Sequence, residues 1–387
     1  MSVVGAAIVV ASVLVASALY LVFYLRWEQG ETNGSRYFMR PAPERLALKR
    51  RIRWYSLPAK PLVHLLARIG RKRSAMPTFE YGGVCGPPKL SSAEVFARAA
   101  NYAPRPDDVF VATQMRSGTT WMQQLVYQIV TRGDGELDAR GRGHLYAVSP
   151  WLDALTAVTV DEAPLVGEKP VRIIKTHLPT QLCPYAAHAK YIYVARHPVR
   201  CFASIVDFNR ALLGPLLPPF PTLVDWFCSD RMYWLPWPRH VDGWWRWATE
   251  RKNVLFVHYE AMIGDFGNVR DAVAAFLGCA LTPDEKRRVD EKCSVGYMKA
   301  HEASFEMASP TMFSAGGAKF LAAGGSAGGR RERDVPALAQ QQITAYCREA
   351  LSGSAYPLAR FYPDVAAGSG APPAAARVAD RAALGRP

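Results

Sequence analysis

A short polar loop, residues 114–120, is the first stretch of the chain whose residue types could do chemistry. It lies between an apolar run and a segment with apolar residues at helical spacing. Arg116 contributes a fixed positive charge. The loop ends in small residues, namely Ser117, Gly118, Thr119 and Thr120. Hydroxyls and backbone N–H groups gathered at a helix N-terminus favour binding of an anion such as a phosphate or sulfate group.

This loop has two other interpretations. Ser and Thr residues at such a position are also ordinary helix caps. A P-loop kinase or nucleotidase would need the sequence G-x-x-x-x-G-K-[ST] and a metal-binding carboxylate near its lysine, and the chain has no such pair. The sequence therefore favours an anion site of another kind.

The elements that would position this loop alternate between strand and helix over residues 96–365. The predicted buried strands are residues 108–113, 171–176, 190–196 and 253–260, and the predicted helices are residues 119–130, 198–209 and 268–277. This alternation predicts an α/β fold in which helices cover both faces of a central, mostly parallel sheet. Ligands of such folds bind at the C-terminal ends of the strands, which is where the loop lies.

Several motifs resemble the sulfotransferase family that uses 3'-phosphoadenosine-5'-phosphosulfate (PAPS), in its cytosolic branch. They are TQMRSGTTW (113–121), IIKTHLP (173–179), YIYVARHPVRCFASIVDF (191–208), HVDGWW (240–245), NVLFVHYEAM (253–262) and CSVGYMK (293–299). The resemblance extends over most of the predicted α/β region. It implies a P-loop-like three-layer fold, transfer of a sulfuryl group from PAPS to a hydroxyl group, and no metal.

The resemblance also implies roles for individual residues. His177 is the expected general base, since imidazole titrates near neutral pH. Lys175 and Arg116 are expected to stabilise charge on the sulfuryl group and on the leaving phosphate. The other expected PAPS-binding residues are Ser117, Gly118, Thr119 and Thr120 at the 5'-phosphate, Arg196 and Ser204 at the 3'-phosphate, and Trp121 and Tyr259 near the adenine.

The chain departs from the family pattern in two charged segments. Arg116 stands where the family usually has a lysine. The arginine keeps the positive charge, but it cannot donate a proton as an acid. The family closes over its donor with R-K-G-x-x-G, whereas this chain has Ala322 and Ala323 at the basic pair. We expect Gly324 to bind the donor through its backbone and Arg330 or Arg331 to reach the 3'-phosphate. The alternative function is a catalytically inactive, membrane-tethered nucleotide-binding protein, although His177, Lys175, Arg196 and Ser204 are all present.

The N-terminal part of the chain predicts a membrane protein. Residues 3–25 form an uncharged run of 23 residues, long enough to cross a bilayer as a helix. The following residues 26–75 contain 13 Lys or Arg and 3 acidic residues, so +10 of the net charge of +14 lies there. By the positive-inside rule the catalytic domain is cytoplasmic. A glycosylated Asn33, in the sequon Asn33-Gly34-Ser35, would instead place it in the Golgi lumen.

These features predict a domain organisation and exclude some partners. The predicted parts are a transmembrane anchor (1–25), a basic juxtamembrane linker (26–95), a sulfotransferase domain (96–365) and a disordered tail (366–387). Little excess charge remains in the domain, which argues against nucleic acid as a partner. Seven scattered cysteines fit a reducing compartment.

The sequence says less about the acceptor molecule than about the donor. An anchored enzyme favours a lipid, a sterol or another small apolar alcohol or phenol, because such molecules concentrate at the bilayer. The tryptophan-rich residues 226–247 are expected to form either a wall of the acceptor pocket or aromatic core. The sequence makes no prediction of an oligomeric state.

Overall fold

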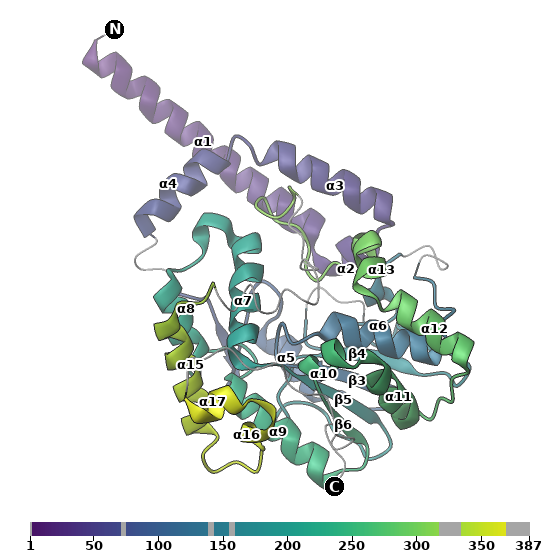
Figure 1. Ribbon diagram of the computed structural model, residues 1–387. Coiled ribbons are helices and arrows are strands. Elements are labelled where there is room, and N and C mark those ends of the chain that lie inside the picture. The colour runs from purple at the N-terminus through teal and green to yellow at the C-terminus, as the bar shows by residue number, and fades with distance from the viewer. Residues whose placement is uncertain (1, 71–74, 138–142, 155–158, 317–333, 369–387) are drawn as a thin grey trace.

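The computed structural model describes residues 2–70, 75–137, 143–154, 159–316 and 334–368. A four-stranded parallel sheet forms its centre, in the order β4-β3-β5-β6 (Figure 1). The strands are β3 (Asp108–Thr113), β4 (Arg172–Thr176), β5 (Lys190–Ala195) and β6 (Val254–His258). Each lies within one residue of its predicted start and two of its predicted end. The predicted parallel α/β fold is therefore confirmed.

The two faces of the sheet are covered by different helices, as the alternation of side chains along a strand requires. On β3, Val109 and Val111 belong to the core shared with the helices on one side, whereas Phe110 and Ala112 belong to the core on the other. The first side is covered by α6 (Thr119–Val130), α11 (Phe266–Leu277) and α12 (Pro283–Lys292). The second side is covered by α5 (Ala93–Ala100), α7 (Pro198–Leu213), α8 (Phe220–Phe227), α9 (Trp237–Glu250) and α15 (Ala337–Ala350).

Shorter elements complete the domain. They are β1 (Phe79–Tyr81), β2 (Val84–Gly86), α10 (Tyr259–Gly264), α13 (Val295–Ala300), α16 (Leu358–Phe361), α17 (Pro363–Ala367) and the 3-10 helices η3 (Leu145–Ala147), η4 (Gly214–Leu216) and η5 (Glu302–Ser304). Of the predicted tail, residues 369–387 lie outside the described residues.

The N-terminal residues form four helices beside this domain. They are α1 (Val3–Thr32), α2 (Gly34–Phe38), α3 (Ala42–Tyr55) and α4 (Lys60–Gly70). The N-terminal half of α1 projects away from the body, and α3 and α4 lie beside its C-terminal half (Figure 1). Over an 18-residue window α1 has a mean hydropathy of 2.5, and none of that window is buried. Its length and composition suit a membrane span.

The residues predicted as a juxtamembrane linker do not form a free linker in the structure. Many of them pack on the domain. Tyr37 and Phe38 of α2 and Leu48 and Ile52 of α3 are buried in the same core as the domain's own apolar residues. The spacing of Arg45, Leu48 and Ile52 directs one narrow stripe of α3 inward. The many cations on the rest of the helix concealed this stripe in the sequence.

Candidate functional site

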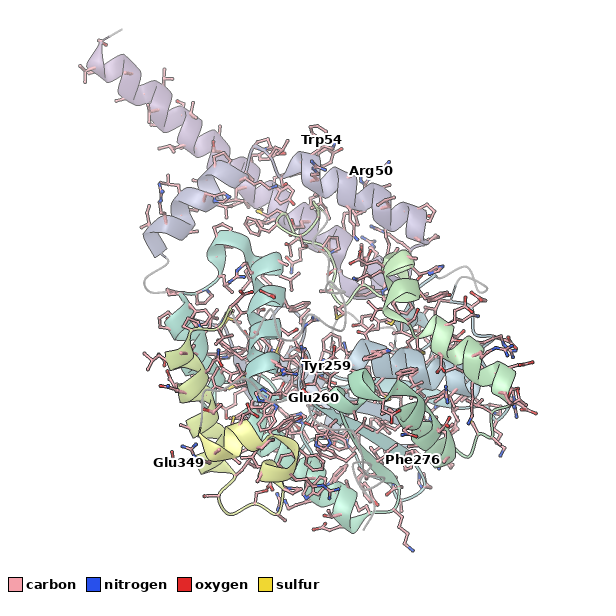
Figure 2. The ribbon with its side chains drawn as sticks, viewed as in Figure 1. Arg50, Trp54, Tyr259, Glu260, Phe276 and Glu349 are labelled. Carbon is pink, nitrogen blue, oxygen red and sulfur yellow. The ribbon has the colours of Figure 1, made fainter. Side chains whose placement is uncertain are left out.

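The site lies at the C-terminal edge of the sheet, where the loops after β3, β4 and β5 and the start of α10 after β6 converge. Figure 2 shows Tyr259 and Glu260 at this edge, at the start of α10. The structure brings together eleven of the predicted site residues on these connections, at the end of β4 and on α6, α7 and α10. The other three, Gly324, Arg330 and Arg331, lie outside the described residues.

The loop after β3 has a backbone shape that suits an anion. Arg116 and Gly118 have positive φ values of 65° and 100°, a turn geometry that directs successive N–H groups to one side. Gly118 is required for a second reason, because a Cβ atom there would lie 2.6 Å from the ring of Tyr259. Gln114 fixes the loop by donating from its amide nitrogen to the carbonyl oxygens of Tyr233 and Leu235, at 3.1 and 2.6 Å.

The hydroxyl residues of the loop lie at the N-terminus of α6. Ser117 is fully buried, and Thr119 and Thr120 are 6% and 7% exposed. The hydroxyl oxygens of Thr113 and Thr119 are 2.6 Å apart. Helix N-termini carry unpaired N–H groups and a partial positive charge. These residues therefore gather hydroxyl and N–H groups at one helix N-terminus, and the binding of an anion there stays a prediction.

His177 directly follows β4, and its tautomer is fixed by its surroundings. Its Nδ1 lies 2.8 Å from the carbonyl oxygen of Thr113. A carbonyl only accepts hydrogen bonds, so Nδ1 carries the proton and Nε2 of the neutral ring keeps its lone pair. Burial, reinforced by the positive charge of Lys175, holds the pKa of His177 well below its usual range. The ring is therefore a neutral base at pH 7.

A buried carboxylate that sequence reasoning missed orients the end of β4. The two oxygens of Asp153 accept hydrogen bonds from the hydroxyl of Thr176 at 2.7 Å, from the backbone N–H of His177 at 3.1 Å and from the indole of Trp234 at 2.7 Å. Burial raises the pKa of Asp153. Asp153 is 23 residues from Thr176 and 81 from Trp234, and no pattern in the sequence links them.

Lys175 lies beside His177 in an aromatic setting. Its ammonium group donates to the hydroxyl of Tyr146 at 2.8 Å and lies 3.4 Å from the centre of the Trp151 ring. Burial lowers the pKa of Lys175 to about 7; Asp153 opposes this shift, and the positive charge of Arg116 adds to it. The repulsion between the two cations would be relieved by an anion near both of them.

Rings around His177 form apolar walls. Trp151 meets the imidazole edge to face, with centroids 5.1 Å apart, and Trp234 lies 4.9 Å away on a tilted plane. Trp234 belongs to the tryptophan-rich stretch in which the sequence predicted either a pocket wall or core. Sequence reasoning did not identify Trp151.

Arg196 and Ser204, eight positions apart, both meet the loop after β3. Arg196 donates to the carbonyl oxygen of Arg116 at 2.7 Å and lies over the ring of Tyr259, 4.6 Å from its centre. Arg196 is 7% exposed, and its buried Nε has no hydrogen-bond partner among the described residues. The Nε of Arg116 donates to the hydroxyl of Ser204 at 3.2 Å.

Trp121 lies further along α6 in an aromatic group. Its ring stacks on Phe266 with centroids 5.4 Å apart and meets Tyr259 edge to face at 6.0 Å. Its indole nitrogen donates to the carbonyl oxygen of Cys293 at 2.9 Å. Trp121 and Tyr259 therefore belong to one aromatic group, and their contact with an adenine stays a prediction.

The segment after η5 reaches the charged part of the site. The guanidinium of Arg116 donates to the sulfur of Met307 at 2.7 Å, and the hydroxyl of Tyr146 donates to the Met307 carbonyl at 3.2 Å. The preceding residue, Glu306, is 5% exposed and forms an ion pair with Lys49 of α3 and a hydrogen bond with Tyr37 of α2. The N-terminal helices thus hold a segment that contacts Arg116.

We expect Glu306→Gln to lower the free energy of unfolding by about 1.5–3 kcal/mol, because it removes the charge from a buried hydrogen-bonded group. Denaturant unfolding of the full chain in detergent measures this. Glu31→Gln is the matched control, since Glu31 also pairs with arginines but is 24% exposed in its side chain. An equal loss in both variants would contradict a specific role of Glu306.

Comparison with known proteins agrees with this geometry. Residues 106–355 match the family described as the sulfotransferase domain. The chain belongs to the sulfotransferase family. The family that the sequence motifs resemble is therefore confirmed. Among the described residues, no three His, Cys, Asp or Glu side chains come together in a way that could hold a metal ion.

Individual sulfotransferases are similar at moderate identity. Cytosolic sulfotransferase 1 of Danio rerio is 26% identical over 246 residues, covering 62% of this chain and 81% of its own. Sulfotransferase 1C2 of Homo sapiens is 30% identical over 223 residues, covering 56% and 70%. Among solved structures, retinol dehydratase in complex with retinol and PAP superposes with a TM-score of 0.56 at 21% identity, covering 76% and 96%. This sulfotransferase therefore shares its fold with a protein whose structure contains PAP.

Proposed function

We propose that this sulfotransferase moves the sulfuryl group of PAPS to a hydroxyl group of an apolar acceptor. Family membership establishes sulfuryl transfer in general terms. The observation that carries the proposal is the pairing of a neutral His177, whose Nε2 is available as a base, with the buried cation Lys175 two residues before it. A base for the acceptor hydroxyl and a cation for the transferred group are the two requirements of this reaction.

The proposed mechanism consists of one proton transfer and the exchange of one sulfur–oxygen bond for another. Nε2 of His177 takes the hydroxyl proton as the acceptor oxygen bonds to sulfur. The bond from sulfur to the 5'-phosphate oxygen breaks, and 3'-phosphoadenosine-5'-phosphate (PAP) leaves with that electron pair. Lys175 and Arg116 stabilise the negative charge on the sulfuryl and phosphate oxygens, and alignment of the reactants supplies much of the remaining rate.

Several contacts support PAPS as the donor. The unpartnered Nε of buried Arg196 can be satisfied by a 3'-phosphate, with Ser204 contributing a hydroxyl. The 5'-phosphosulfate would take the N–H groups and hydroxyls at the start of α6, from Ser117 to Thr120. The adenine would contact Trp121 and Tyr259. Mouse sulfotransferase complexed with PAP, with a TM-score of 0.53 at 20% identity, supports the same donor.

The proposed acceptor is an apolar alcohol or phenol, and the proposed location is a membrane. Trp151 and Trp234 would provide apolar contact beside His177. Retinol dehydratase has been solved with retinol and with androsterone, and a Cavia porcellus relative at 28% identity is a 3-alpha-hydroxysteroid sulfotransferase. With α1 as a single-pass anchor and the basic residues after it, the catalytic domain would face the cytoplasm.

Calorimetric titration of the full chain with PAP, with AMP as the control nucleotide, tests the donor. We expect Arg196→Ala to weaken PAP binding by about ten- to a hundredfold, because a hydrogen bond to a charged group contributes about 1.5–3 kcal/mol. Arg210→Ala is the matched control, since Arg210 lies on α7, the helix that follows Arg196, and has a 63% exposed side chain. PAP binding no tighter than AMP binding would refute the proposed donor.

A further inference from the structure

The helices α3 and α4 present a surface that the described part of the domain leaves exposed. Their inward residues pack on the body and on α1, while seven large apolar side chains of α3, α4 and the turn between them are about half exposed or more. The seven apolar residues are each at least 49% exposed, and they are Leu46, Trp54, Tyr55, Leu57, Leu65, Leu66 and Ile69. Together with Arg50, Arg53 and Arg68 they form what we name the outer face. Figure 2 shows Arg50 and Trp54 on the side of α3 that points away from the body.

This combination of side chains fits a lipid surface. Seven exposed large apolar residues within 24 positions are unusual for a surface in contact with water alone. The three arginines of the outer face make no ion pair with any residue that the structure describes. Apolar residues interleaved with unpaired cations are typical of helices that lie in the headgroup region of anionic membranes.

The contacts with α1 put the outer face at the depth of a bilayer boundary. The hydroxyl of Tyr20 donates to the carbonyl oxygen of Tyr55 at 2.8 Å, and the rings of Trp27 and Tyr55 lie 5.1 Å apart. The turn between α3 and α4 therefore lies beside residues 20–27 of α1. The residues of α1 before Tyr20 span about 25 Å at 1.5 Å per residue, close to the thickness of a hydrocarbon core.

The aromatic residues at this level agree with that depth. Tyr20, Trp27, Trp54 and Tyr55 come from both α1 and α3, and Trp and Tyr are enriched where a membrane meets water. An arginine, Arg51, lies over the Trp27 ring at 5.8 Å and pairs with Glu31. The level of residues 20–27 thus has the composition of a membrane interface.

We propose that the outer face of α3 and α4 docks on the anionic lipid headgroups of the leaflet in which α1 ends. This proposal depends on the proposed membrane span of α1. The opposite side of α3 donates from Arg45 to the carbonyl oxygen of Ala303 at 2.7 Å and pairs through Lys49 with Glu306. Docking would therefore hold the segment that contacts Arg116 toward the bilayer, from which an apolar acceptor would enter.

Fluorophores attached to single cysteines test the docking in the full chain, reconstituted in phosphatidylcholine nanodiscs with and without phosphatidylserine. The partly exposed Cys228 and Cys279 are first replaced by serine, since the other five cysteines are buried. Labels at Trp54→Cys and Ile69→Cys should be quenched by nitroxide-labelled lipid, more strongly with phosphatidylserine. A label at Glu349→Cys, an exposed position of α15 away from α3 (Figure 2), should not be quenched.

Three outcomes would overturn the proposal. Quenching at positions 54 and 69 as weak as at 349 would show that lipid does not cover the outer face. Quenching without dependence on phosphatidylserine would remove the role of the arginines. Disulfide crosslinks between the unlabelled Trp54→Cys side chains of two chains would show that a second copy occupies the face.

A label on the anchor separates failure of docking from failure of the span. Val15 is 59% exposed on α1, and a Val15→Cys label should be quenched in either lipid. If it is quenched while positions 54 and 69 are not, docking fails and the anchor stands. The double variant Arg50→Glu, Arg53→Glu, which alters exposed residues only, should reduce quenching at Ile69→Cys in the presence of phosphatidylserine.

Discussion

The His177→Gln variant is expected to lose turnover by about 10²–10⁴-fold while it binds PAP as tightly as the wild type, which is the range of effect for a positioned general base. Glutamine keeps a donor that can reach the carbonyl oxygen of Thr113, but it has no basic nitrogen at neutral pH. The acceptor proton then has no base to take it. Transfer of labelled sulfate from PAPS to a phenol or sterol measures turnover, and calorimetry measures PAP binding.

The pH profile provides a second measure of the same role. Because burial and Lys175 hold the pKa of His177 well below its usual range, the base is neutral throughout the neutral range. We expect turnover to show no loss on the acid side until the pH is well below 6.5. His188→Gln is the matched control, since His188 is exposed and bonds only to the carbonyl oxygen of Pro104 among the described residues.

A fall in both turnover and PAP affinity in His177→Gln would show that the variant has lost the structure of the site. Unchanged turnover would refute the role of His177 as the base. His188→Gln should leave both measurements unchanged.

The central fold could be predicted because its signals are local. The strand β3 is a short apolar run and α6 has apolar residues at helical spacing, so the sequence located the loop between them, where Arg116 and Gly118 take left-handed conformations. Parallel strands bring their C-terminal ends to one edge. That rule alone puts the residues after β3, β4 and β5 near each other.

The supports of the site could not be predicted, because they join distant segments without a repeating pattern. Asp153 lies in a loop, and its role depends on contacts with Thr176 and Trp234 that only the folded chain creates. Glu306 is tied to Lys49, 257 positions earlier. In the sequence, Lys49 is one of many cations after the apolar run, and its inward direction depends on the buried stripe of α3.

Lys175→Met is expected to reduce kcat/KM for PAPS by about 10²–10³-fold, the range seen when one preorganised donor to a transition state is removed. Methionine nearly matches the lysine in length and apolar volume, so the packing against Trp151 is retained. The loss would therefore come from the missing charge. Lys190→Met, at the opposite end of the parallel sheet, is the matched control.

The pH dependence distinguishes a catalytic Lys175 from a merely structural one. Burial lowers the pKa of Lys175 to about 7, so the free enzyme carries the required cation below that pH and loses it above. Since kcat/KM reports groups of the free enzyme, its value for PAPS should fall as the pH rises through about 7. This alkaline fall should be absent in Lys175→Met and present in Lys190→Met.

Stability should change with pH in the opposite direction, because of the same pKa. An unfolded chain binds the lysine proton up to a pH near 10.5, whereas the folded chain releases it above about 7. Between these values the unfolded state holds more protons, so the free energy of unfolding should rise with pH. Lys175→Met should lack this rise. In the wild type, activity should therefore fall above pH 7 while stability rises. Loss of both effects together in Lys175→Met would assign the buried cation to the transition state.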